Sequence, residues 1–290
     1  MTTDFLGNVR VALLIALATG HATAQTPAPP NAVELAYATK SPLQKLDLYV
    51  PQQGTGPFPL VVWIHGGGFR VGDKRSMPRR DFGPPPVAVG RDGPYQIQVP
   101  DVTALTAKGY AVASLNYRLG SPIRDAALPA VQDAKAAIRY LRGNASAYHL
   151  DERRIAVWGN SAGGIMAALL GATGDQPTLF DDPALGNPGV SSAVQAVVVW
   201  FGADDRLGKV FNAATYASTA RRLPPFLIAN GDADPIISTA QATRLHEALL
   251  KAGAASTLTI LPGAGHEDPA FMATQMLPTF EFIDQALQHR

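Results

Sequence analysis

Residues 154–164 read RIAVWGNSAGG, and residues 165–170 continue as the apolar run IMAALL. This stretch predicts a buried strand, a tight turn and a helix. The small residues Gly159 and Gly163 allow a turn so sharp that Ser161, between them, takes unusual backbone angles and projects clear of the sheet. A G-x-S-x-G turn of this kind exposes the serine Oγ at a helix N-terminus, where backbone N–H groups favour developing negative charge. The stretch is therefore predicted to be a nucleophile elbow.

The composition is that of an ordinary globular domain. The chain has 290 residues, of which 47% are hydrophobic and 16% are charged, so it can bury one large core or at most two small ones. The net charge of +1 gives no sign of a nucleic-acid partner. The absence of cysteine excludes disulfides, thiolate metal sites and a thiol nucleophile. No metal or cofactor is expected.

The basic residues are scattered, with one denser group before the middle of the chain. Such a group could attract an anionic substrate, but a solvated loop surface is the commoner arrangement of exposed Lys and Arg. We therefore expect solvent exposure for Arg70, Lys74, Arg75, Arg79 and Arg80.

The N-terminus has the pattern of a secretory signal. The apolar run 11–18 is too short to span a bilayer, and it is followed by Ala22-Thr23-Ala24, an A-x-A cleavage pattern. Residues 1–24 are therefore predicted to be a signal peptide, with a retained N-terminal helix as the alternative. Residues 25–31 would be the disordered start of a periplasmic or secreted chain with no membrane association.

Apolar strands alternate with helical patterns from residue 32 to residue 290. This alternation predicts one doubly wound α/β domain with a mostly parallel sheet and antiparallel strands at its N-terminal edge. The expected strands are Val33–Ala38, Lys45–Val50, Leu60–Ile64, Ala111–Asn116, Ile155–Trp158, Val194–Phe201, Pro225–Asn230 and Ser256–Leu261. The expected helices are Asp101–Lys108, Leu128–Leu141, Ala162–Gly171, Ser238–Ala252 and Phe271–Gln288.

Residues 71–100 hold no helix or strand pattern, because prolines and glycines interrupt every periodicity. A loop of this length is uncommon in a compact domain unless it is functional or disordered. We expect a lid-like insertion beside the functional site, with a surface loop of no consequence as the alternative.

Three further motifs each follow a predicted strand. The turn His65-Gly66-Gly67-Gly68 can point backbone N–H groups at a substrate oxygen. The loop 230–235, NGDADP, carries two carboxylates, and the loop 262–266, PGAGH, ends in His266. The chain order serine, aspartate, histidine is that of α/β-hydrolases.

These blocks resemble one family more closely than others. Residues 63–70 (WIHGGGFR), 72–75 (GDKR), 114–119 (SLNYRL) and the elbow are similar to the hormone-sensitive-lipase-like branch of α/β-hydrolases, and within it to the bacterial bifunctional feruloyl and acetylxylan esterase-like group. The resemblance runs from about Leu46 to the C-terminus and implies the α/β-hydrolase fold.

The resemblance also implies the roles of individual residues. Ser161 would be the nucleophile, His266 the base and Asp234 the acid, because the Gly-x-x-Asp spacing selects Asp234 over Asp232. The oxyanion hole would be formed by the N–H groups of Gly67, Gly68 and Ala162.

Three residues depart from the group's pattern, and so does the length of one segment. Asn160, Ile165 and Glu267 stand where the group commonly has another residue, and the segment 77–100 is longer than usual. These departures leave the three predicted catalytic residues untouched but bear on the substrate.

The implied function is a serine carboxylic-ester hydrolase for short acyl or aryl esters, such as acetyl or feruloyl esters of plant polysaccharides. An amidase or peptidase of the same fold is the alternative, and a non-catalytic binding protein would require a broken triad. The partner is a small-molecule or oligosaccharide ester. Trp63 and Trp158 are expected in the core, and His65 is expected to hold the glycine turn. Candidates for lining an acyl or alcohol pocket are Phe69, Tyr95, Phe201 and Phe211.

Overall fold

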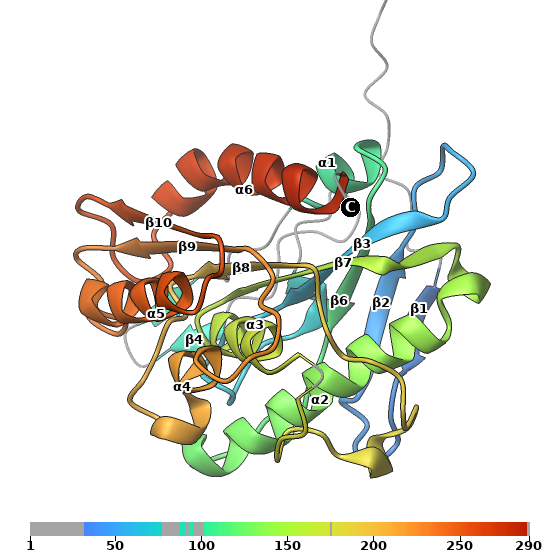
Figure 1. Cartoon of the computed structure of the whole chain (residues 1–290), viewed down its shortest axis with the longest axis horizontal. Coiled ribbons are helices and arrows are strands. Elements are labelled where there is room, and N and C mark those ends of the chain that lie inside the picture. The colour runs from blue at the N-terminus through green and yellow to red at the C-terminus, as the bar shows by residue number, and fades with distance from the viewer. Residues whose placement is uncertain (1–31, 77–87, 91–92, 96–100, 175, 289–290) are drawn as a thin grey trace, which may run out of the picture.

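The computed structural model describes residues 32–76, 88–90, 93–95, 101–174 and 176–288 (Figure 1). The predicted signal peptide, 1–24, and the predicted disordered segment, 25–31, lie outside the described residues and stay predictions.

Within the described residues, one sheet of eight strands runs through the domain in the order β1-β2-β6-β3-β7-β8-β9-β10. The strand β2 pairs antiparallel with both of its neighbours, and every other pair in this sheet is parallel. This topology confirms the prediction of a mostly parallel sheet with antiparallel strands at its N-terminal edge. The strands are β1 (Ala32–Ala36), β2 (Lys45–Tyr49), β3 (Phe58–Ile64), β6 (Ala111–Leu115), β7 (Leu150–Asn160), β8 (Ala196–Trp200), β9 (Phe226–Gly231) and β10 (Ser256–Leu261).

Helices cover both faces of the sheet (Figure 1). The helices α1 (Val102–Ala107) and α6 (Ala270–Gln288) lie on one face. The opposite face carries α2 (Ile123–Gly143), α3 (Ala162–Thr173), α4 (Ala213–Ala217) and α5 (Thr239–Lys251). None of the described helices is long and apolar enough to cross a bilayer. Short 3₁₀ turns occur at η1 (Lys74–Ser76), η2 (Ala145–Tyr148), η3 (Pro183–Leu185) and η4 (Lys209–Phe211).

The central strands are apolar on both sides because each side faces a separate core. In β3, Leu60, Val62 and Ile64 belong to the core under α2 and α3. Val61 and Trp63, which alternate with them, belong to the core under α1 and α6. Alternation of side chains across a strand explains why a continuous apolar run predicts a strand that is covered on both faces.

Two elements extend beyond their predicted bounds. The helix α2 begins at Ile123 rather than at Leu128, and it continues through Pro129. A proline inside a helix removes one backbone hydrogen bond, so prolines are more common in the first turn of a helix. Pro129 therefore favours a helix that starts near Leu128, whereas the structure has the start at Ile123. The strand β7 begins at Leu150, before the predicted Ile155, because Leu150 pairs with Phe58 across a bulge.

The segment 71–100 has more regular structure than its sequence predicts. It contains η1 and an antiparallel pair of short strands, β4 (Ala88–Gly90) and β5 (Gly93–Tyr95). The expectation that no strand forms here is therefore wrong for these residues. Most of 77–100 lies outside the described residues, so its role as a lid stays a prediction.

Lys74 is buried, which corrects the expectation of a solvated basic loop for this residue. Its Nζ lies 2.9 Å from Asp47 Oδ2 on β2, and both side chains are 3% exposed. The same ammonium also pairs with Glu34 on β1. The Lys74 backbone N–H donates to Asn116 Oδ1, just after β6. These contacts hold the start of the insertion against the antiparallel edge of the sheet.

Replacing Lys74 with methionine should therefore cost about 3–5 kcal/mol of unfolding free energy, because it removes the main partner of a buried carboxylate. Urea unfolding of the wild type and K74M measures this difference. The double variant K74M/D47L removes both charges and should recover most of the loss. A cost below about 1 kcal/mol for K74M would mean that the pair is not buried in solution.

Candidate active site

Ser161 forms the turn between β7 and α3. Its backbone angles are φ 49° and ψ −122°, as expected for the sharp elbow. The Ser161 N–H donates to the Trp200 carbonyl of β8 at 3.0 Å, and the Ser161 carbonyl accepts from Ile165 N. A Cβ on Gly163 would lie 2.0 Å from the Ile64 carbonyl oxygen of β3, so only glycine fits there. The elbow is thus fixed against the ends of two neighbouring strands.

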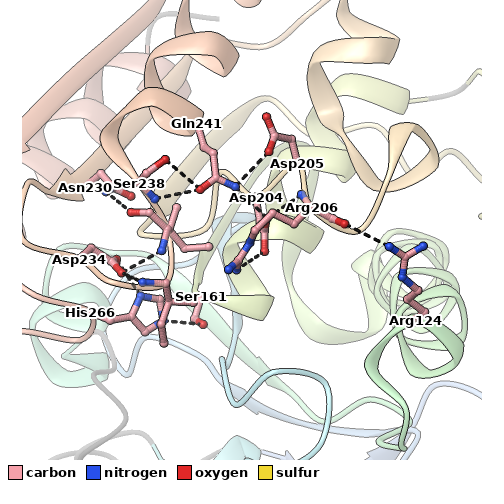
Figure 2. A network of polar contacts seen from close by, with 12 residues as sticks. Arg124, Ser161, Asp204, Asp205, Arg206, Asn230, Asp234, Ser238, Gln241 and His266 are labelled. Carbon is pink, nitrogen blue, oxygen red and sulfur yellow. Dashed lines mark hydrogen bonds and ion pairs between the residues drawn. The ribbon is translucent and has the colours of Figure 1, made fainter.

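Three side chains from distant parts of the sequence meet at this turn (Figure 2). His266 Nε2 lies 2.9 Å from Ser161 Oγ, and His266 Nδ1 lies 2.7 Å from Asp234 Oδ2. Asp234 follows β9 and His266 follows β10. Parallel strands end at the same edge of the sheet, which is why motifs over 100 residues apart converge.

Asp234 is held so that one oxygen faces the histidine. Its Oδ1 accepts from the backbone N–H groups of Ile236 and Ile237 at 2.7 and 2.8 Å, and its side chain is fully buried. An ionised carboxylate only accepts hydrogen bonds, so the imidazole proton lies on Nδ1 of His266. The other ring nitrogen, Nε2, is then free to accept the Ser161 hydroxyl proton.

Asp232, the other carboxylate of this loop, has a different contact. Its Oδ1 accepts from the backbone N–H of Gly263 at 2.6 Å. This bond links the loop that carries Asp234 to the loop that carries His266. Asp232 therefore holds the two loops together, whereas Asp234 contacts the imidazole.

Phe201 packs behind the His266 ring instead of lining a substrate pocket. The two ring centroids are 5.0 Å apart at an interplanar angle of 69°, and Phe201 contacts Phe271 of α6 on its other side. Phe201 is fully buried and does not border the cleft beside Ser161. This placement corrects its expected role as a substrate contact, because the residue orients the histidine from the core.

The glycine turn after β3 lies beside the elbow. Gly67 and Gly68 have φ angles of 97° and 60°, and the Gly67 carbonyl accepts from Arg70 N and Val71 N. A Cβ on Gly67 would lie 2.1 Å from the Val71 carbonyl oxygen. Gly68 and Ala162 border the same cleft as Ser161. The turn and the start of α3 thus flank the serine hydroxyl.

His65 supports this turn from within the core. Its Nδ1 lies 2.8 Å from the Gly66 carbonyl oxygen, and its ring stacks on Tyr117 at 4.4 Å between centroids. Burial lowers the pKa of His65 to about 4, so the ring is neutral near pH 7 and Nδ1 can donate to Gly66. The Tyr117 hydroxyl also contacts the carbonyl oxygens of His65 and Gly66. Tyr117 lies in the block 114–119, and the sequence analysis did not assign it a role.

Ser161 borders a cleft of about 630 Å³. Of the four aromatic candidates, Phe69 borders this cleft, but its side chain is almost fully buried. Phe211 packs against Phe180 and lines a smaller adjoining pocket that shares Ile165 and Asp204 with this cleft. Tyr95 ends β5, and its side chain lies outside the described residues. The other lining residues are Gly68, Arg70, Ser121, Pro122, Ile123, Arg124, Ala162, Ile165, Asp204, Arg206, Leu207, Ile236 and Ile237.

The three residues that depart from the pattern of the resembled group lie in three different environments. Asn160 is fully buried at the end of β7, and Ile165 faces the cleft. Glu267 has a φ angle of 61° directly after His266. Burial raises the pKa of Glu267 from its ordinary 4.5 to about 7, and Asp234 contributes in the same direction while His266 opposes it.

The raised pKa of Glu267 makes stability depend on pH. Between pH 4.5 and about 7 the folded state holds a proton that the unfolded state releases, so stability falls as pH rises through this window. Glu267→Gln removes the ionisation. Its stability relative to wild type should rise by about 2–3 kcal/mol between pH 4.5 and pH 8. Urea unfolding at four pH values tests this, and parallel curves for the two proteins would contradict the burial of the carboxyl group.

The sequence matches two family models and is similar to known proteins. The BD-FAE family model matches residues 46–83 and 91–222, which is more than half of the chain. The Dienelactone hydrolase family model matches residues 185–279. Esterase LipC of Mycobacterium tuberculosis is 27% identical over 78% of this chain. The alignment covers 57% of LipC, so this chain spans little more than half of that relative.

Solved structures share the fold over most of the chain. A truncated form of a carbohydrate esterase from gut microbiota has a TM-score of 0.72 at 23% identity, covering 91% of this chain and 100% of that one. The bifunctional GH43-CE of Bacteroides eggerthii has a TM-score of 0.69 at 25% identity, covering 88% of this chain and 35% of that one. The chain has the α/β-hydrolase fold and belongs to the BD-FAE family.

Proposed function

We propose that this protein is a serine-dependent carboxylic-ester hydrolase that works through an acyl-enzyme on Ser161. The observation that carries the proposal is the continuous hydrogen-bonded relay from Asp234 through His266 to Ser161, with contacts of 2.7 and 2.9 Å. A buried carboxylate, an oriented imidazole and a hydroxyl in this order form the arrangement that activates a serine for attack. Membership of the BD-FAE family and the esterase name of LipC support an ester as the bond that is cleaved.

The first half of the reaction transfers the acyl group to the enzyme. Ser161 Oγ attacks the ester carbonyl carbon while its proton moves to His266 Nε2, and Asp234 stabilises the imidazolium that forms. The carbonyl oxygen becomes an oxyanion, which the N–H groups of Gly67, Gly68 and Ala162 receive in this proposal. One such donor lowers the barrier by about 2.7–4 kcal/mol. The tetrahedral intermediate then collapses, and the leaving alcohol takes the proton from Nε2.

The second half releases the acid. A water molecule gives a proton to His266 Nε2 as its oxygen attacks the acyl carbon, and a second oxyanion occupies the same place. Collapse of this intermediate returns the proton to Ser161 Oγ and frees the carboxylic acid. The hydrogen bonds that fix Asp234 keep the imidazole aligned for both halves.

Short acyl or aryl esters fit this site best in our proposal. The cleft of about 630 Å³ is lined by Phe69 and by aliphatic side chains such as Ile165 and Leu207. Acetyl or feruloyl esters of plant polysaccharides are candidate substrates, and carbohydrate esterases among the structural neighbours support this class. The signal-like pattern of residues 1–24 supports export to the periplasm or the medium.

Alanine in place of Ser161 should lower kcat/KM for p-nitrophenyl acetate by about 10³-fold or more, because the nucleophile is lost. His266→Ala should have an effect of similar size, and Asp234→Asn should cost about 10²–10⁴-fold. Initial rates measured against the matched control Ser146→Ala, an exposed serine in η2, check these values. Retention of a tenth or more of the activity by Ser161→Ala would rule out the proposed mechanism. The rate of p-nitroacetanilide hydrolysis, measured in parallel, shows how strongly the enzyme prefers the ester bond to the amide bond.

A further inference from the structure

The cleft beside Ser161 is lined by more positive than negative side chains. Its lining includes three arginines, Arg70, Arg124 and Arg206, but a single carboxylate, Asp204. The other lining groups are apolar or uncharged. A neutral acyl ester carries no charge that would pair with these guanidinium groups. The partners of each arginine within the protein therefore decide which charges stay available to a ligand.

Arg206 is neutralised within the protein (Figure 2). Its Nη2 lies 2.7 Å from Asp204 Oδ2, and its Nε lies 2.9 Å from Asp204 Oδ1, which makes a bidentate pair. Asp204 also accepts from Gln241 Nε2 at 2.9 Å. The carboxylate is therefore saturated by groups of its own loop and of α5, and among the described residues it does not compensate the charge of Arg70 or Arg124.

Arg70 and Arg124 reach the cleft from two separate elements. Arg70 directly follows the glycine turn after β3, and Arg124 lies in the first turn of α2. Figure 2 shows Arg124 extending from its helix toward Arg206, where Nη2 makes a long contact of 3.5 Å with the backbone carbonyl oxygen. Across the described part of the chain, the acidic partners of arginine include Asp73, Asp133, Asp151, Asp204 and Asp205, and none of them pairs with Arg70 or Arg124.

Unpaired arginines also occur elsewhere among the described residues, such as Arg221 and Arg222 in a separate depression, so Arg70 and Arg124 are distinguished by their place beside Ser161. Lys74 pairs with Asp47, and Arg75 pairs with Asp73. Arg70 lies in the same segment, yet it borders the cleft without such a partner among the described residues. The two positive charges are thus available to a ligand that approaches Ser161.

We propose that the cleft selects esters that carry a second, ionised carboxylate, which Arg70 and Arg124 bind while Ser161 attacks the ester bond. A guanidinium group offers a planar fork of N–H donors that matches a carboxylate, and charge-assisted hydrogen bonds of this kind are among the strong ones. Ile165 and Leu207, which line the cleft, contact the hydrocarbon between the two groups of the substrate. This inference rests on the proposed function, because it concerns the substrate of the same nucleophile.

Two matched pairs of substrates test the inference on both sides of the ester bond. On the acyl side, the mono-p-nitrophenyl ester of adipic acid is compared with p-nitrophenyl hexanoate. On the alcohol side, 3-acetoxybenzoate is compared with its methyl ester. In each pair a free carboxylate is the main difference. The wild type should prefer the anionic member of at least one pair by about tenfold in kcat/KM at low salt, and 0.5 M NaCl should reduce this preference.

Variants of Arg70 and Arg124 test whether these side chains cause the preference for the anionic ester. In R70Q/R124Q the ratio of kcat/KM for the anionic and the neutral member should fall by about tenfold, and each single variant should give part of this loss. The control R221Q/R222Q removes the same charge from a separate depression, so its ratio should stay within about twofold of wild type. Thermal unfolding of each variant shows whether it has folded, and the single variants carry the test if the double variant has not.

The outcomes separate this inference from the proposed function. Ser161-dependent hydrolysis of the neutral esters with no anionic preference, or with a preference that R70Q/R124Q retains, overturns the inference and leaves the esterase proposal standing. Failure of the wild type to hydrolyse either member of both pairs through Ser161 overturns both.

Discussion

The structure depends on the turn at Ser161, where the backbone takes a conformation that a serine rarely adopts. Such a residue costs of order 1–3 kcal/mol and persists only where its surroundings hold it. Here the hydrogen bond from Ser161 N to Trp200 O ties the turn to β8, and the close approach of Gly163 to Ile64 O ties it to β3. Because β3, β7 and β8 end together, the glycine turn after β3 comes to lie beside the serine, and the loops after β9 and β10 bring the carboxylate and the imidazole to it.

The core also positions the histidine. The loop 262–266 is rich in small residues and could not by itself fix the ring of His266. The ring is held by Asp234 on one side and by Phe201 on another, and Phe201 in turn packs on Phe271 of α6. The helix that covers one face of the sheet is therefore connected through two aromatic rings to the proposed general base.

Features that depend on residues close in sequence could be predicted, whereas features that depend on contacts between distant residues could not. The apolar runs of β3 and β8 identify strands without knowledge of their neighbours, and short motifs at strand ends brought Ser161, Asp234 and His266 together as candidates. The burial of Lys74 could not be predicted, because it depends on Asp47, which lies 27 residues away on β2. Phe201 was predicted to line the pocket, but its side chain lies in the core, where its contacts with His266 and Phe271 depend on distant parts of the chain. The start of α2, where Arg124 lies, was not predicted, because Pro129 lies inside this helix.

In the proposed mechanism, His266 and Asp234 activate one serine among all those in the chain. Treatment with a fluorophosphonate probe followed by peptide mass spectrometry tests it most directly, because the probe reacts with activated serines and leaves ordinary hydroxyls unmodified. We expect one adduct, on Ser161, that forms in the wild type and is lost in His266→Ala. An adduct on another serine, or labelling of Ser161 that does not depend on His266, would contradict it.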